Sequence, residues 1–303
     1  PRHNNRFGQG IKSKTFRTIE TMSLAFVKYE GAGNDFILID NREGAWQKYA
    51  TANMGSDGSE KSLIAGLCDP KFGIGADGLM LLENKEGFDF EMVYFNSDGG
   101  KSSMCGNGGR CIASWAFRLG LGKGDSLHFW APDGTHIAKR ISHHKDAMTA
   151  GKNLEWISLS MNDVDSVLQV EPNCYELNTG SPHYVCIQSE NINALDLVTW
   201  ARGIRYSARY TASGINVNAV NILDNNRIQM RTYERGVEGE TLSCGTGVTA
   251  AALSLATMKS LGGGLIHVET KGGDLSVAFD RSPQGFCNIQ LQGPARWVFS
   301  GTL

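Results

Sequence analysis

The chain carries the same short pattern twice, once in each half: a cysteine, two glycines separated by one residue, and a run typical of a helix. The first copy, CGNG, spans Cys105–Gly108 and the second, CGTG, spans Cys244–Gly247. Each copy follows several strand-like segments and precedes a predicted hairpin, which turns at Asp133–Gly134 in the first half and at Gly272–Gly273 in the second. A repeat of this size predicts two similar α+β domains, each with one helix wrapped in strands.

The helices of this plan are predicted from apolar periodicity and from the glycines that end them. We expect one helix in the segment 47–69 that ends near Cys68, one from Arg110 to Leu119, and one at 193–206. The run that follows Cys244 is rich in Ala, Ser and Thr and ends at the glycines 262–264, so it is expected to pack tightly inside protein. Residues 1–21 are basic and lack a signal-peptide core; we expect a disordered or non-native tail, with a transit peptide as the alternative.

Composition narrows the class of protein. The 303 residues are 41% hydrophobic and carry 29 basic and 31 acidic side chains. This balance gives no electrostatic case for nucleic acid or an anionic membrane, so a small molecule bound in a cleft is the expected partner. The seven cysteines are scattered, odd in number and form no CxxC pair, which argues against a disulfide scaffold or a zinc ribbon. A reducing compartment, the cytoplasm, is expected.

Five of the cysteines are expected to be structural free thiols, because free cysteine usually acts as a small core hydrophobe. They are Cys68, Cys111, Cys174, Cys186 and Cys287. Cys105 and Cys244 differ because each stands at a predicted helix start among glycines. There the first backbone N–H groups have no partners inside the helix, so they can bind a carboxylate and lower the pKa of a nearby thiol.

Two such thiols on opposite sides of one carbon atom can invert a stereocentre next to a carboxylate. One sulfur, as thiolate, removes the proton from one face, and the other, as thiol, delivers a proton to the opposite face. The developing negative charge spreads into the carboxylate, where helix-end N–H donors stabilise it. If the domains face each other, both thiols line the cleft between them. This scheme needs no pyridoxal, metal or nicotinamide, and no cofactor is expected.

Further blocks of sequence carry a resemblance to a known family. GAGNDF, GIGADG, FNSDG, CGNGGRC, TGSPH, INVN, ERGVEGET and KGGDL occur in this order. From about Leu24 onward the chain resembles the diaminopimelate epimerase family. The resemblance implies two pseudo-symmetric α+β domains, each a barrel-like, mostly antiparallel sheet around a central helix. The implied limits are 22–150 and 151–290, with 291–303 returning to the first domain.

The resemblance also implies an activity and a site. The family interconverts LL- and meso-diaminopimelate without a cofactor, for lysine and peptidoglycan synthesis. By this resemblance Cys105 is the proton donor and Cys244 the acceptor in the LL-to-meso direction, and His183 and Glu234 tune the thiols. Substrate contacts are implied for Asn34, Asn96, Gly106, Asn107, Ser181, Asn216, Glu234, Arg235, Gly245 and Thr246. From the residues alone, His183 would be a packing histidine, Asn34 a turn residue and Arg235 a surface partner of Glu234.

Three alternatives stay open. A proline or hydroxyproline racemase of the same superfamily would usually carry His in place of Asn107, and a phenazine-biosynthesis-like isomerase would lack the cysteine pair. A protein of another class, a non-catalytic carboxylate binder or thiol-redox sensor, could use the same two cysteines without epimerisation. The expected partner is diaminopimelate, with no nucleic acid and no membrane. A homodimer is compatible with the sequence, which does not fix the oligomeric state.

Overall fold

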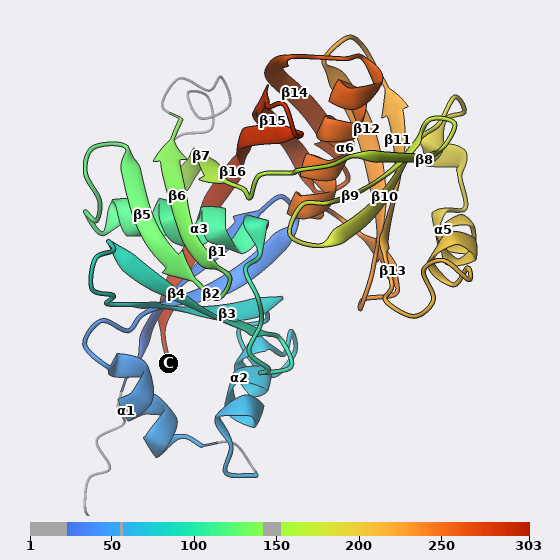
Figure 1. Cartoon of the computed structure of the whole chain (residues 1–303). Coiled ribbons are helices and arrows are strands. Elements are labelled where there is room, and N and C mark those ends of the chain that lie inside the picture. The colour runs from blue at the N-terminus through green and yellow to red at the C-terminus, as the bar shows by residue number, and fades with distance from the viewer. Residues whose placement is uncertain (1–22, 55–56, 142–152) are drawn as a thin grey trace, which may run out of the picture.

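The computed structural model describes residues 23–54, 57–141 and 153–303, so the predicted tail at residues 1–21 lies outside the described part. The chain forms two domains that share one continuous mixed sheet (Figure 1). Among the described residues, no helix is both long and apolar enough to cross a membrane.

The sheet of the first domain closes on itself around one helix. Neighbours pair in the order β1-β2-β3-β4-β5-β6-β7-β16, and β16 pairs back with β1. The strands are β1 (Ala25–Gly31), β2 (Asn34–Asp40), β3 (Gly78–Glu83), β4 (Phe90–Asn96), β5 (Ser126–Ala131), β6 (Gly134–Arg140), β7 (Leu154–Ser160) and β16 (Phe286–Thr302). The enclosed helix, α3 (Gly106–Arg118), is buried from Asn107 to Phe117.

The second domain repeats this arrangement around α6 (Gly245–Met258). Its sheet runs β16-β15-β14-β12-β11-β10-β9-β8, and β13 pairs with β12. These strands are β8 (Leu168–Glu171), β9 (Cys174–Asn178), β10 (Pro182–Ile187), β11 (Asn216–Ile222), β12 (Arg227–Glu234), β13 (Gly239–Thr241), β14 (Gly263–Thr270) and β15 (Gly273–Arg281). The parallel pair β10–β11 corresponds to the parallel pair β2–β3 of the first domain.

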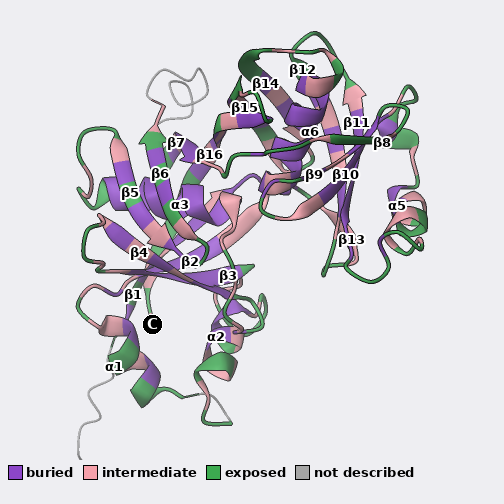
Figure 2. Ribbon diagram, viewed as in Figure 1, coloured by how far each residue is buried: buried purple, intermediate pink, exposed green. Residues whose placement is uncertain are grey.

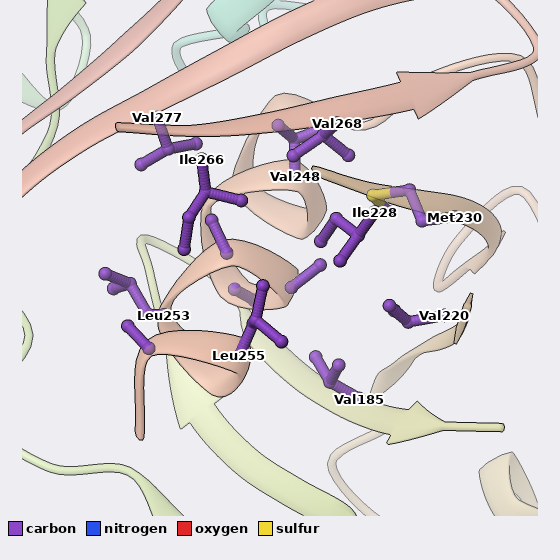
Figure 3. Close-up of a cluster of buried hydrophobic side chains, with 14 of the residues drawn as sticks. Val185, Val220, Ile228, Met230, Val248, Leu253, Leu255, Ile266, Val268 and Val277 are labelled. Carbon is purple, nitrogen blue, oxygen red and sulfur yellow. The ribbon is translucent and has the colours of Figure 1, made fainter. Parts of the chain in front are cut away.

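The two central helices lie in the middle of the two main cores (Figure 2). Around α6, small residues at 250–252 let the helix approach the strands, and larger side chains such as Val248 and Leu255 fill the space toward Val185, Ile228 and Ile266 (Figure 3). The prediction of a tightly packed helix after Cys244 is therefore confirmed, but the helix ends at Met258 and not at the glycines 262–264, the last two of which begin β14. Both predicted hairpins, β5–β6 and β14–β15, are confirmed as well.

In the described part of the chain, three helices cover the outside of the barrels. In place of the single helix expected at 47–69 there are two, α1 (Ala45–Ala52) and α2 (Glu60–Cys68), so that prediction was wrong about the first half of the segment. The second begins where the Ser59 side chain caps the Ser62 N–H, which is a local start signal in the middle of the expected helix. The helix expected at 193–206 is α5 (Leu197–Arg205), preceded by the 3₁₀ turn η2 (Ile192–Ala194).

One helix begins earlier than predicted. α3 starts at Gly106, directly after Cys105, whereas the sequence predicted a start at Arg110. The glycines at this end have low helix propensity, but the segment is packed against the core, and such packing overrides propensity. The earlier start matters, because it makes Cys105 the N-cap residue of the helix.

Two cysteines are not free thiols, contrary to expectation. Cys174 on β9 and Cys186 on β10 form a disulfide. The antiparallel register places these two residues directly opposite each other, with Cα atoms 4.1 Å apart. Cys68, Cys111 and Cys287 are free, as predicted.

Candidate active site

The two motif cysteines are the N-cap residues of the two central helices. Cys105 precedes α3 and Cys244 precedes α6, both in an extended backbone conformation. The helix starts touch each other: a Cβ atom built on Gly245 would lie 3.5 Å from the Gly106 Cα atom. Beneath both glycines lies Leu291 of β16, whose Cδ2 would come within 3.0 Å of a Cβ on Gly106 and 2.9 Å of one on Gly245. Gly106 and Gly245 therefore lie where the two helix starts meet, and a side chain on either glycine would crowd Leu291.

Burial sets the charge state of both thiols. It raises the pKa of Cys105, while the N–H groups of Gly108 and Asn107 and the Arg110 guanidinium act to lower this pKa. Burial, with a smaller contribution from the nearby Glu234 carboxylate, raises the pKa of Cys244 to about 12. The Thr246 hydroxyl and the Gly247 N–H oppose that rise. The sequence predicted lowered thiol pKa values; the helix ends do act in that direction, but desolvation outweighs them.

A chain of hydrogen-bonded polar side chains lies beside the start of α3. The Asn34 side chain, at the start of β2, donates from Nδ2 to Asp77 Oδ2 over 2.8 Å and accepts from Asn107 Nδ2 over 2.7 Å. Asn107 Oδ1 in turn accepts from Arg110 Nη2 over 2.9 Å. The Asn34 and Asn107 side chains, both predicted to bind substrate, are thus brought together beside the first helix start.

The surroundings of Cys244 are built from hydroxyl groups and one imidazole. Thr246 Oγ1 lies 3.3 Å from Cys244 Sγ, 2.9 Å from His183 Nε2 and 3.1 Å from Ser181 Oγ. Ser181 Oγ also lies 3.0 Å from His183 Nε2. His183 is fully buried, and burial with the nearby Arg235 charge lowers its pKa to about 3, so the ring is neutral near pH 7.

A third group holds the ends of β11 and β12. Asn216 donates from Nδ2 to Ser181 Oγ and to the Pro182 carbonyl, and its Oδ1 accepts the Arg235 N–H over 2.8 Å. The exposed Arg235 side chain donates to the Ser213 carbonyl. Burial raises the pKa of Glu234, whose carboxylate acts on both thiols.

Asn96 is the one predicted residue that the structure does not connect to the others. It ends β4, it is exposed, and its side chain hydrogen-bonds to none of the described residues. Its neighbour across the sheet is Gly78 of β3.

Sequence reasoning missed two buried polar residues that contact this machinery. Arg110 is fully buried in α3, and Asn218 is fully buried on β11. A signal for each was present: Arg110 is a charge inside an otherwise apolar helical run, and Asn218 follows Asn216 by two residues, on the same face of a strand. Within the described ranges, no three His, Cys, Asp or Glu residues are grouped so that they could hold a metal ion.

A second contact joins the domains beside the site. The turn between β1 and β2 reaches the turn between β14 and β15: a Cβ on Gly272 would lie 2.0 Å from the Ala32 carbonyl oxygen. Next to it, a Cβ on Gly33 would lie 2.9 Å from Leu242 Cβ. The turn that precedes Asn34 therefore rests on the second domain.

Comparison with known proteins points to one family. The sequence profile of the family described as diaminopimelate epimerase matches residues 26–152 and 175–298. The diaminopimelate epimerase of Flavobacterium psychrophilum is 44% identical over 276 residues, which cover 91% of this chain and 98% of that protein. That of Chlorobaculum tepidum is 38% identical over 277 residues, or 90% and 98% of the two chains.

Solved structures share the fold at much lower identity. A phenazine biosynthesis protein of the PhzF family from Bacillus anthracis gives a TM-score of 0.62 at 13% identity, covering 93% of this chain and 99% of that one. A hydroxyproline epimerase from Agrobacterium vitis, solved with bound trans-4-hydroxy-L-proline, gives 0.59 at 13% identity, covering 93% and 91%. At this identity the likeness concerns the fold alone, and it confirms the predicted two-domain α+β architecture.

Proposed function

Because the chain belongs to the diaminopimelate epimerase family, we propose that it inverts one stereocentre of diaminopimelate with Cys105 and Cys244 as its two acid–base groups. The activity is that of an isomerase that interconverts the LL and meso forms. One observation carries the assignment of the pair: the two cysteines cap two helices whose first residues, Gly106 and Gly245, touch across the domain boundary.

The reaction moves one proton off a carbon atom and another onto its opposite face. In the LL-to-meso direction the Cys244 thiolate takes the α-proton, and the electron pair left on carbon is delocalised into the adjacent carboxylate. The Cys105 thiol then delivers its proton to the opposite face, so the enzyme ends with the thiol and thiolate exchanged. In the reverse direction the roles are exchanged, which suits two groups of the same kind.

The carboxylate at the reacting carbon is held by the helix starts. The N–H groups of the first residues of α3 and α6 have no partner within their helices and carry the positive end of each helix dipole. The side chains of Asn107 and Thr246 are engaged within the protein, to Asn34 and Arg110 and to His183 and Ser181. Backbone donors of Gly106, Asn107, Gly245 and Thr246 are therefore the better candidates for this contact than those two side chains.

The distal amino-acid end of the substrate meets the residues at the rim. Arg235 is exposed at the end of β12, and its planar fork can bind a carboxylate with two hydrogen bonds. Glu234 beside it can accept from an ammonium group, and Asn34, Asn96, Ser181 and Asn216 supply further donors and acceptors around the site. A substrate with a single carboxylate, such as proline, would leave Arg235 without a partner.

The deciding experiment is turnover of LL-diaminopimelate against L-proline, with reductant and in deuterated water. We expect deuterium at one stereocentre of diaminopimelate without added cofactor, and no turnover of proline. Cys105→Ala and Cys244→Ala should each abolish epimerisation, because each removes the only acid or base on one face of the carbon. Full activity in either variant would refute the two-thiol scheme, and a redox sensor would lack turnover in the unaltered protein.

The setting of the enzyme follows from the same proposal. We place the reaction in lysine and peptidoglycan precursor synthesis and the protein in the cytoplasm, in line with the five cysteines that remain free beside the Cys174–Cys186 disulfide. A homodimer remains a proposal that a measurement of molecular mass in solution would test.

A further inference from the structure

The two domains place different side chains at the same three positions around their helix starts. In the second domain these are His183 on β10, Asn218 on β11 and Thr232 on β12. Asn218 pairs with Thr232 across the sheet, and His183 pairs with Asn216, two residues before Asn218. All three side chains are buried, with exposed fractions of 0%, 0% and 2%.

The corresponding positions of the first domain are apolar or aromatic. Met80 on β3 pairs with Tyr94 on β4, and Phe36 on β2 pairs with Gly78, two residues before Met80. The last glycine of each motif, Gly108 or Gly247, contacts two of these three positions and so supports the correspondence. A Cβ on Gly108 would meet Met80 Cε and Phe36 Cε1, at 2.0 and 3.5 Å.

In the second domain, a Cβ atom placed on the matching glycine, Gly247, meets Asn218 and His183. A Cβ on Gly247 would meet Asn218 Oδ1 at 2.8 Å and His183 Cε1 at 3.3 Å. Strand pairing and helix contact thus agree that His183, Asn218 and Thr232 replace Phe36, Met80 and Tyr94. Of the three first-domain residues only Tyr94 carries a polar group, its hydroxyl, and among the described residues the set of His, Asn and Thr is found on the Cys244 side alone.

The orientation of the Asn218 amide is fixed by its partners. Its Nδ2 lies 3.0 Å from the Tyr184 carbonyl oxygen, which can only accept, so the nitrogen must face that oxygen. Its Oδ1 accepts the Thr232 hydroxyl over 2.9 Å. The second Nδ2 hydrogen is then directed at His183 Nδ1, 3.1 Å away.

This donor decides the tautomer of the buried histidine. A ring nitrogen that accepts a hydrogen bond carries no proton, so the single proton of neutral His183 lies on Nε2. Near Nε2 are two hydroxyl oxygens, Thr246 Oγ1 at 2.9 Å and Ser181 Oγ at 3.0 Å, and either can accept this proton. With a lone pair of Thr246 Oγ1 occupied by this network, the Thr246 hydroxyl proton is free to point at Cys244 Sγ, 3.3 Å away.

We propose that Asn218, fixed by Thr232, is a positioning residue that holds His183 as the Nε2–H tautomer and so directs the Thr246 hydroxyl proton at the Cys244 sulfur. The effect is to stabilise the thiolate form of Cys244 and not that of Cys105, which has no corresponding chain. This inference rests on the proposed two-thiol function, whose asymmetry it explains.

Other charges act on these groups and must be held constant in a test. Glu234 of β12 and the Cys105 thiol act on Cys244, and Arg235 acts on His183. The N–H of Gly247 also lowers the Cys244 pKa. Substitutions at Asn218 or Thr232 leave all of these groups in place.

The tautomer is measured first, by nitrogen NMR of the whole protein labelled at histidine. We expect His183 to show an unprotonated Nδ1 and a protonated Nε2, with no titration between pH 5 and 8 or so. In Asn218→Asp, a carboxylate replaces the donor, so Nδ1 should become protonated. A protonated Nδ1 in the unaltered protein would overturn the proposal.

The effect on the acidity of the Cys244 thiol is measured without substrate, by alkylation with iodoacetamide in the presence of reductant. Peptide mass spectrometry gives the rate at each cysteine as a function of pH. In Asn218→Leu, the ring can take the other tautomer, whose bare Nε2 draws the Thr246 proton away from sulfur. We expect the pH profile of Cys244 to move up by roughly one unit, the loss of one hydrogen bond to a charged group, and that of Cys105 to stay.

Two further variants serve as comparison. Thr232→Val, of nearly the same shape, should shift the pH profile of Cys244 alkylation in the same direction but less. This substitution removes only the hydrogen bond from the Thr232 hydroxyl to Asn218 and leaves the Asn218 amide in place. Met80→Leu, at the matching position of the first domain, should leave the Cys244 profile unchanged. Equal shifts in Asn218→Leu and Met80→Leu would overturn the proposal, since they would indicate general loosening.

Turnover of LL-diaminopimelate by the unaltered protein is measured beside these experiments. Absence of turnover would refute the proposed function whatever the tautomer. Normal turnover with an unshifted Cys244 profile in Asn218→Leu would refute the relay alone.

Discussion

At the scale of single residues, Arg110 brings a buried positive charge to the start of α3. Its guanidinium is fully buried and forms no ion pair with any described residue. Its hydrogen bonds go to neutral groups, the Gly106 carbonyl over 3.1 Å and Asn107 Oδ1 over 2.9 Å. A buried cation is costly unless an anion compensates it. In the proposed reaction two anions become available, the Cys105 thiolate and the carboxylate of the substrate. The matching position of α6 is Thr249, so this charge too is confined to one half.

We therefore expect Arg110→Met to lower kcat/KM for LL-diaminopimelate by about 100-fold, the size of effect produced by removal of one preorganised donor. Arg110→Lys keeps the charge but not the fork, and it should lose less. Thr249→Val, the matched change in α6, should stay close to the unaltered enzyme. Thermal unfolding of each variant shows whether the fold is intact, and full activity in a folded Arg110→Met protein would contradict this role.

At the scale of the elements, the two central helices have the same start but different neighbours. Glycine inside a helix normally lowers the free energy of unfolding by roughly 0.5–1 kcal/mol relative to alanine. The presence of glycine at positions 108 and 247 therefore needs a structural explanation. A Cβ atom at position 108 would clash with the end of the flexible Met80 side chain, which can move away. A Cβ atom at position 247 would instead crowd the Asn218 amide oxygen and the His183 ring, which are both fixed by hydrogen bonds.

This difference predicts opposite outcomes for one substitution. Gly108→Ala should keep most activity and unfold within about 1 kcal/mol of the unaltered protein, because the helix gain offsets a small rearrangement. Gly247→Ala should lose about tenfold or more in kcat, since displacement of the helix start misplaces Cys244. Steady-state kinetics and denaturant unfolding of both proteins test this, and equal losses of activity would count against it.

For the whole molecule, the relation between the domains rests on β16 and on two contacts between glycines and their neighbours. β16 pairs with β15 in one domain and with β1 and β7 in the other, so a single strand belongs to both sheets (Figure 1). Above it, Gly106 meets Gly245, and Gly272 meets the Ala32 carbonyl. Gly272 does not adopt a left-handed backbone conformation, so its lack of a side chain is required by packing: chiefly by Ala32 of the other domain, and to a lesser degree by Ser243 of its own, whose Cβ would lie 3.2 Å away.

Gly272→Ala should therefore separate the domains without damaging either core. The added methyl group would lie 2.0 Å from the Ala32 oxygen, and relief requires that the domains move apart. We expect kcat/KM to fall by about tenfold or more, with a larger radius of gyration in small-angle scattering. Gly262→Ala, which meets nothing within 4 Å, is the control and should change neither quantity. An unchanged radius with reduced activity would place the cause elsewhere.

Much of this molecule could be predicted from patterns that are local in the chain. The repeated cysteine–glycine motif predicted two related domains with a buried helix each, the hairpins followed from their turns, and the motif blocks placed the family. These features depend on neighbours along the sequence, and so a pattern of a few residues is enough to carry them.

Tertiary structure decided what depends on partners distant in the sequence. The disulfide between Cys174 and Cys186 follows from strand register, and the raised thiol pKa values follow from burial that no motif reports. Asn218 joins the site only because β11 is folded against the start of α6. Arg110 is close to Cys105 in the sequence, but its complete burial is a result of packing. The sequence by itself determined which two sulfurs stand at helix ends. Only packing decided that they differ, because a thiol's charge state depends on every group around it, whichever part of the chain supplies that group.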